Sequence, residues 1–173
     1  MIRAAAFLCL LATPIDAAGF NFCWAGNGGY TMTGRIEFPD ELMGRIITER
    51  DVTEFEIIGY EFGVAIGRWN MNDRTPSTTW HLRFDPRSLT FPTGGSFPGE
   101  LSQGWNADGE VTDCGQRGFG FNSGNYAQDI CLYGVWIAQS SIPPETPLRA
   151  TPNPVSPDCR AVDFLGKSGK AAK

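Results

Sequence analysis

The chain has 173 residues, with 19 acidic and 14 basic side chains and a formal net charge of −5 at neutral pH. The acidic excess lies in residues 19–142, which carry eight arginines against fifteen Asp and Glu, a balance of −7. This charge excludes nucleic acid and anionic membrane surfaces as expected partners. A single histidine, His81, leaves few catalytic sites open.

Residues 1–18 are predicted to be a signal peptide. Met1–Arg3 gives a positive start, Ala4–Ala12 is an apolar run too short to anchor in a bilayer, and Ala17 and Ala18 offer small residues for cleavage. The alternative is an amphipathic first helix, but no polar stripe interrupts the run. We therefore expect a secreted or periplasmic protein with no membrane anchor.

Four cysteines follow this leader: Cys23, Cys114, Cys131 and Cys159. An even number in an exported chain indicates two disulfides, whereas zinc sites need closely spaced pairs that the sequence lacks. Cys114 and Cys131 flank a strand-like run and are expected to pair locally, which leaves Cys23 to pair with Cys159. The two other pairings remain alternatives.

Short runs of period-two alternation dominate the next 120 residues. They predict an all-β domain over residues 19–142, an antiparallel two-sheet β-sandwich of seven or eight short strands, with a barrel as the alternative. The runs are 29–38, 52–57, 62–66, 79–84, 89–91, 118–121 and 130–138.

The C-terminal part changes in composition. Six of the fifteen residues from Pro143 to Pro157 are proline, so residues 143–159 are expected to form a Pro-rich extension packed on the domain, outside the sheets and held by Cys159. Residues 160–173, which end in GKSGKAAK, are expected to be a basic disordered tail.

The strand segments Tyr30–Gly34, Ile47–Phe55, Trp80–Leu82, Phe84–Phe91 and Gly118–Phe121 carry a family resemblance. Over residues 29–138 the chain resembles exported bacterial all-β domains of unknown function, of the type associated with PEP-CTERM sorting tails. It lacks the sorting tail itself. The resemblance implies export and β architecture, and it implies no activity.

The motifs of catalysis and cofactor binding give no catalytic residue, no cofactor and no metal site. Residues 94–99 have proline where a nucleophile elbow needs glycine, and residues 104–115 depart from a calcium loop at the first and last ligand positions. Glu54 and Glu56, two positions apart on one strand, could serve a carboxylate-dependent polysaccharide hydrolase, although such alternation is also typical of a solvent-facing strand.

The long segment from Pro92 to Asn125 is the predicted site if the domain binds a ligand, the alternative being an inert connection. Trp105 is expected to be an exposed surface for sugar stacking, with polar groups around it from Asn106, Asp108, Glu110 and Asn125. The expected function is a non-enzymatic structural or binding role, with a glycan or another exported protein as partner. The alternatives are a carbohydrate-binding module and the hydrolase built on Glu54 and Glu56.

Overall fold

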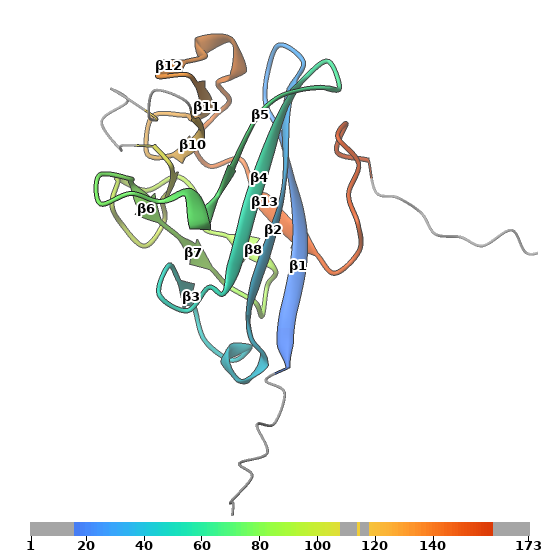
Figure 1. The fold of residues 1–173 in the computed structure, drawn as a ribbon, viewed down its shortest axis with the longest axis vertical. Coiled ribbons are helices and arrows are strands. Elements are labelled where there is room, and N and C mark those ends of the chain that lie inside the picture. Colours follow the sequence, from blue (N-terminus) through green and yellow to red (C-terminus); the bar gives the residue numbers. More distant parts are fainter. Residues whose placement is uncertain (1–15, 108–113, 115–117, 161–173) are drawn as a thin grey trace, which may run out of the picture.

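The computed structural model describes residues 16–107, 114 and 118–160, and these form an all-β structure in antiparallel sheets (Figure 1). This confirms the predicted fold class. The helical elements among these residues are three short 3-10 turns: η1 (Asp40–Leu42), η2 (Met71–Asp73) and η3 (Ala138–Ser140). None of the described helices is long and apolar enough to cross a membrane.

The larger sheet has six strands, and three of them are long and central. Its spatial order is β5 (Val64–Asn70), β4 (Glu54–Glu61), β2 (Tyr30–Pro39), β1 (Ala17–Ala25), β13 (Leu148–Thr151) and β8 (Thr90–Phe91). β1 and β2 pair over nine consecutive residues, which makes them the backbone of this layer.

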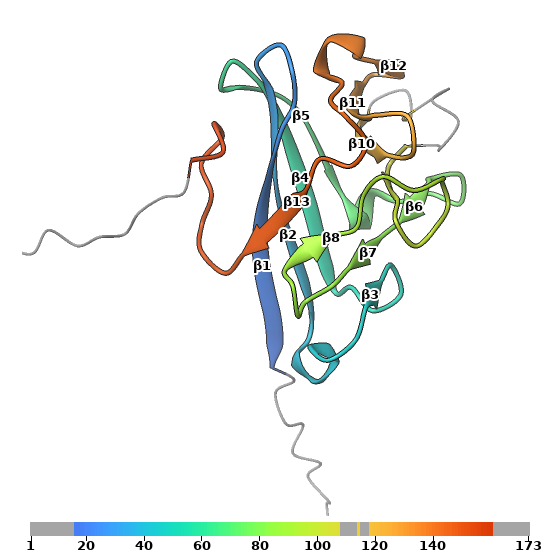
Figure 2. The ribbon, with the colours of Figure 1, turned by 180° about the vertical axis from the view of Figure 1, so that it is seen from behind.

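The second sheet lies across one face of the first, as Figures 1 and 2 show from opposite sides. Its strand order is β12 (Val135–Trp136), β11 (Gln128–Leu132), β10 (Phe119–Ser123), β9 (Gln103–Trp105) and β6 (Trp80–His81). A separate two-stranded sheet joins β3 (Ile47–Thr48) to β7 (Arg83–Phe84).

Alternation along the long strands builds the core. Phe22 of β1, Ile36 of β2 and Phe55 of β4 are all fully buried and face the second sheet. Close approach of the two layers requires glycine at residue 59, because a Cβ there would lie 2.1 Å from the ring of Phe119. In this article the side of each sheet that faces the other is its inner face, and the opposite side is its outer face.

The Pro-rich extension differs from its prediction. Leu148–Thr151 is not outside the sheets but forms β13, which pairs with β1 on one side and β8 on the other. The four residues contain no proline, since Pro147 and Pro152 lie just beyond the two ends, and Leu148 and Ala150 alternate into the core. Proline flanks the strand and leaves every amide within it free to donate.

The ends of the chain bear on two further predictions. β1 begins at Ala17, opposite Pro39, so the last two residues of the predicted signal peptide are paired in this structure. Residues 1–15 and the tail from 161 onward lie outside the described residues. The alternation prediction missed β1, β3, β9 and β13, whereas it located the other long strands, β2, β4 and β5.

Both predicted disulfides are confirmed. Cys23 is bonded to Cys159 across 136 positions, and Cys114 is bonded to Cys131 across 17. The first bond joins β1 to the segment after β13, and the second joins β11 to the connection before β10. Two disulfides fit an oxidising, extracytoplasmic location.

Candidate functional site

Trp105 does not form the predicted binding surface. It has no exposed area, and its ring centroid lies 4.8 Å from that of Phe55, 4.9 Å from Phe121 and 5.3 Å from Phe22. The prediction of an exposed tryptophan is therefore wrong. β9 is an interior strand between β6 and β10, so alternate side chains on it must point into the core.

The other predicted ligand residues do not gather around it. Asn106 has a positive φ of 52°, and its amide nitrogen donates to the backbone oxygens of Cys114 (2.9 Å) and Phe119 (3.0 Å). Its role is thus to fix the loop. Asn125 is exposed in the turn between β10 and β11, while Asp108 and Glu110 lie outside the described residues.

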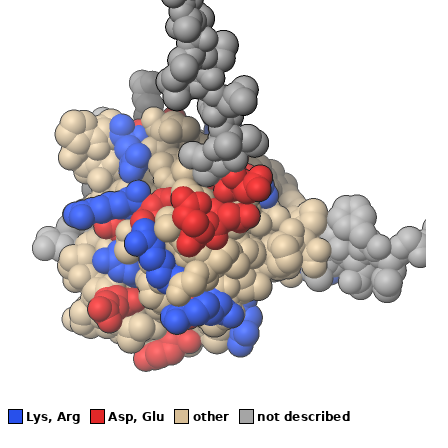
Figure 3. Space-filling view, turned by 90° about the horizontal axis from the view of Figure 1, so that it is seen from below, with Lys and Arg blue, Asp and Glu red and all other residues tan. Residues whose placement is uncertain are grey.

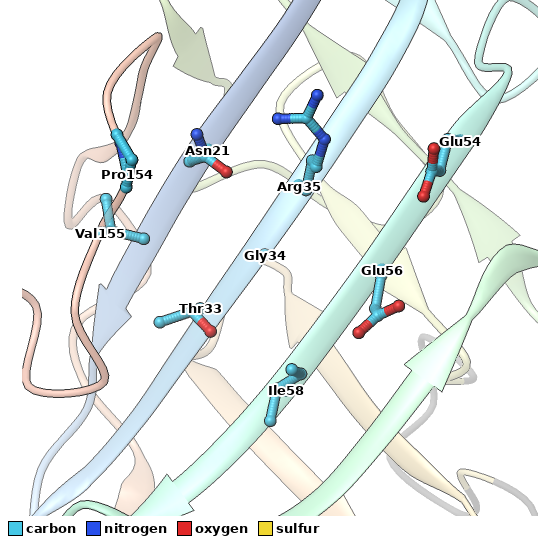
Figure 4. Close-up of a pocket in the computed structure, with 9 residues that line it drawn as sticks. All are labelled: Asn21, Thr33, Gly34, Arg35, Glu54, Glu56, Ile58, Pro154 and Val155. Atoms are coloured by element: carbon cyan, nitrogen blue, oxygen red, sulfur yellow. The ribbon is translucent and has the colours of Figure 1, made fainter.

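A hollow of about 260 Å³ lies instead on the outer face of the six-stranded sheet (Figure 4). Its floor comes from β1, β2 and β4, and one wall comes from the chain that follows β13. The lining residues are Asn21, Thr33, Gly34, Arg35, Glu54, Glu56, Ile58, Pro154 and Val155.

We call residues 152–160, which form this wall, the C-terminal strap. The strap turns back beside β1 and is tied to the sheet at three places (Figure 1). The amide nitrogen of Asn21 donates to the backbone oxygen of Asn153 at 3.2 Å, and the hydroxyl of Thr31 donates to that of Pro157 at 2.5 Å. The Cys23–Cys159 disulfide is the third tie, so the wall has a fixed position.

Strand register lines up the polar groups of the floor. Asn21 of β1 lies opposite Arg35 of β2, which lies opposite Glu56 of β4, which lies opposite Asn70 of β5. Glu54 lies two residues before Glu56 on β4, opposite Glu37 of β2. Because these residues share the outer face, their side chains form one row of donors and acceptors across four strands.

The hollow has more negative than positive charge. Arg35 donates through Nε to Oε1 of Glu37 at 2.9 Å, so its charge is already paired. Among the described residues neither Glu54 nor Glu56 forms an ion pair, and Glu56 accepts only a long bond, 3.5 Å, from the amide of Asn70. Two carboxylates are thus available to a ligand.

The charges at the lower end of the sandwich behave differently. Figure 3 shows acidic groups gathered there with basic groups around them. Two of the carboxylates near β3 and β7 are compensated: Asp51 pairs with Arg45 at 2.7 Å, and Glu49 pairs with Arg83 at 2.8 Å. The carboxylates of Asp51 and Glu49 are thus already paired, unlike those of Glu54 and Glu56 in the hollow.

Both carboxylates of the hollow are accessible to solvent. Glu54 is exposed and Glu56 is half-buried, so water reaches both side chains. Their spacing on one strand agrees with the predicted solvent-facing alternation. The sequence identified these two residues, but it missed Asn21, Thr33, Arg35 and the strap, because their neighbourhood is created by strand pairing and by the disulfide.

Comparison with protein-family models, with curated proteins and with solved structures found no match for this chain. The resemblance of residues 29–138 to PEP-CTERM-associated domains therefore stays an expectation.

Proposed function

We propose that this chain is a secreted or periplasmic, non-enzymatic binding domain and that its ligand is a glycan held in the hollow on the six-stranded sheet. The observation that carries the proposal is the fixed wall. A disulfide and two hydrogen bonds hold the C-terminal strap at the edge of a row of polar side chains, and preorganised walls favour ligand binding because less ordering is needed on association.

The lining has the chemistry that a sugar needs. Carboxylates of Glu54 and Glu56 accept from hydroxyl groups, and the amide of Asn21 and the hydroxyl of Thr33 offer further polar contacts. Ile58, Pro154 and Val155 give apolar surface for the C–H face of a pyranose ring. None of the lining residues is aromatic, so recognition rests on hydrogen bonds and we expect modest affinity.

The test is a glycan array followed by calorimetry on the strongest hit. The full chain is expressed with its leader into an oxidising compartment, so that both disulfides form. Glu56→Gln and Arg35→Ala should each weaken binding at least tenfold, because each removes a charged hydrogen-bonding group from the floor. Glu100→Gln, an exposed acid outside the hollow, is the matched control and should bind as the wild type does.

Equal affinity of all three variants and the wild type contradicts the proposed site.

The second candidate function, a polysaccharide hydrolase acting through Glu54 and Glu56, is favoured only by the presence of this carboxylate pair in the hollow. It predicts new reducing ends when the same glycans are incubated with the protein, and their loss in Glu54→Gln.

A further inference from the structure

The outer face of the second sheet holds two buried oxygens without a hydrogen-bond partner among the described residues. They are Oδ1 of Asn122 on β10 and Oδ1 of Asp129 on β11, in side chains whose residues are only 6% and 9% exposed. The two residues are direct cross-strand partners. Side chains in that relation have Cβ atoms about 5 Å apart, so both oxygens belong to one small region.

Asp129 brings a carboxylate into this region without compensation. Its Oδ2 accepts from the hydroxyl of Ser141 at 3.3 Å, and no Arg within the described part of the chain forms an ion pair with it. Burial raises the pKa of Asp129 to about 6, against hydrogen bonds from Ser141 and Asn122 that act to lower it. A buried charge that lacks a counter-charge is costly.

We propose that Asn122 and Asp129, with Ser141 beside them, bind a divalent calcium ion on the outer face of the second sheet. The site lies on the opposite layer from the hollow and does not depend on the function proposed for it. One calcium ion would supply a positive charge next to the carboxylate of Asp129. It would also be the missing partner of the two free oxygens.

The donor set selects the class of metal. Carboxylate, amide and hydroxyl oxygens are hard ligands that suit Ca²⁺, whereas Zn²⁺ and Cu²⁺ prefer the nitrogen and sulfur ligands of His and Cys. The single histidine, His81, instead donates through Nε2 to the backbone oxygen of Gly99 at 2.8 Å. With one carboxylate in the site, we expect a Kd in the range of extracellular calcium modules, about 10⁻⁴ to 10⁻³ M.

The experiment measures the melting temperature of the full chain in EDTA and in increasing CaCl2. The wild type should melt higher as Ca²⁺ rises through the millimolar range, by mass action on the folded state. Asp129→Asn, which keeps the shape and removes the charge, should melt at least as high as the wild type in EDTA and should lose the response to Ca²⁺. Glu100→Gln, the matched control, should keep the full response.

A direct readout separates binding from general salt effects. Tb³⁺ substitutes for Ca²⁺, and its luminescence is sensitised by nearby tryptophan. It should rise on titration into the wild type, fall on addition of Ca²⁺, and be absent in Asp129→Asn. An unchanged melting temperature in Ca²⁺ together with no Tb³⁺ signal overturns the proposal and leaves water as the partner of the two oxygens. An equal Ca²⁺ response in wild type and Asp129→Asn overturns it as well.

Discussion

Arg35 and Glu56 lie directly opposite each other on β2 and β4, yet the guanidinium of Arg35 pairs with Glu37, two positions away on its own strand. The pairing on one strand leaves the carboxylate across the ladder free. This arrangement keeps the carboxylate of Glu56 available in the hollow, and substitution of Glu37, which competes with Glu56 for Arg35, tests it.

Glu37→Gln should let Arg35 turn to Glu56. We expect a change in unfolding free energy below about 1 kcal/mol, since the pair is solvent-exposed and such pairs contribute little. Glycan binding should weaken, because Glu56 is then occupied. Urea denaturation and calorimetry with the array hit measure the two effects, and Glu61→Gln on the same sheet is the control. Unaltered binding in Glu37→Gln speaks against the free carboxylate as a ligand group.

Trp105→Ala should destabilise the domain by about 3–5 kcal/mol, because it empties the centre of an aromatic cluster. Trp105→Phe keeps most of the ring and removes an indole N–H that has no partner among the described residues, so its cost should be smaller, about 1–2 kcal/mol. Urea unfolding followed by fluorescence gives both values. A loss below about 1 kcal/mol in Trp105→Ala is incompatible with a core position.

The two disulfides should differ in their contributions. In the chain-entropy account, the 136-residue separation of Cys23 and Cys159 corresponds to about 5 kcal/mol and the 17-residue separation of Cys114 and Cys131 to about 3 kcal/mol. We expect the Cys23→Ser, Cys159→Ser pair of substitutions to lower stability more than Cys114→Ser with Cys131→Ser. Denaturant midpoints of the two double variants decide the order, and the reverse order would show that native contacts outweigh loop closure.

Loss of the first disulfide has a local consequence too. It should speed hydrogen exchange at Asn153 and Val155 while leaving β10 and β11 protected, because the strap keeps only its two hydrogen bonds to β1 and β2. Exchange mass spectrometry resolves the strap from the second sheet.

Glu49 should make stability fall in acid. Burial acts to raise the pKa of Glu49, but the N–H of Leu82 and the charge and hydrogen bond of Arg83 outweigh burial and lower it below its ordinary value of 4.5. A lowered pKa means that the stabilisation is complete above pH 4.5 and is lost as the pH falls through the value in the folded state. The effect should stay below about 1 kcal/mol, because the pair is partly solvated.

The measurement is the free energy of unfolding of wild type and Glu49→Gln between pH 7 and pH 3. The variant should show a shallower acid limb, and Glu100→Gln should follow the wild type. Part of the acid dependence should remain in Glu49→Gln, since Arg45 and Thr48 also lower the pKa of Asp51. Parallel curves for wild type and Glu49→Gln are the outcome that contradicts this account.

The candidate sites were predictable only in part. Alternation placed Glu54 and Glu56 together on one strand face, and the hollow contains both. The same kind of reasoning failed for Trp105, because polar and glycine neighbours in the sequence do not show whether a three-residue strand is an edge or an interior one. Asn122 and Asp129 come together through pairing of β10 with β11, and an amide and a carboxylate seven positions apart match no metal-binding motif.

The all-β class and the alternation of most long strands could be predicted from the sequence, because both follow from local periodicity. The sequence favoured the observed pairing of the cysteines but left two other pairings open, because spacing along the chain does not show which strands lie side by side. The tertiary structure alone decided what the C-terminal segment does. Leu148–Thr151 enters the six-stranded sheet, although prolines surround it, because β1 and β8 present two open edges that four free amides can satisfy. That insertion sets the path of the strap, and the strap creates the wall of the hollow.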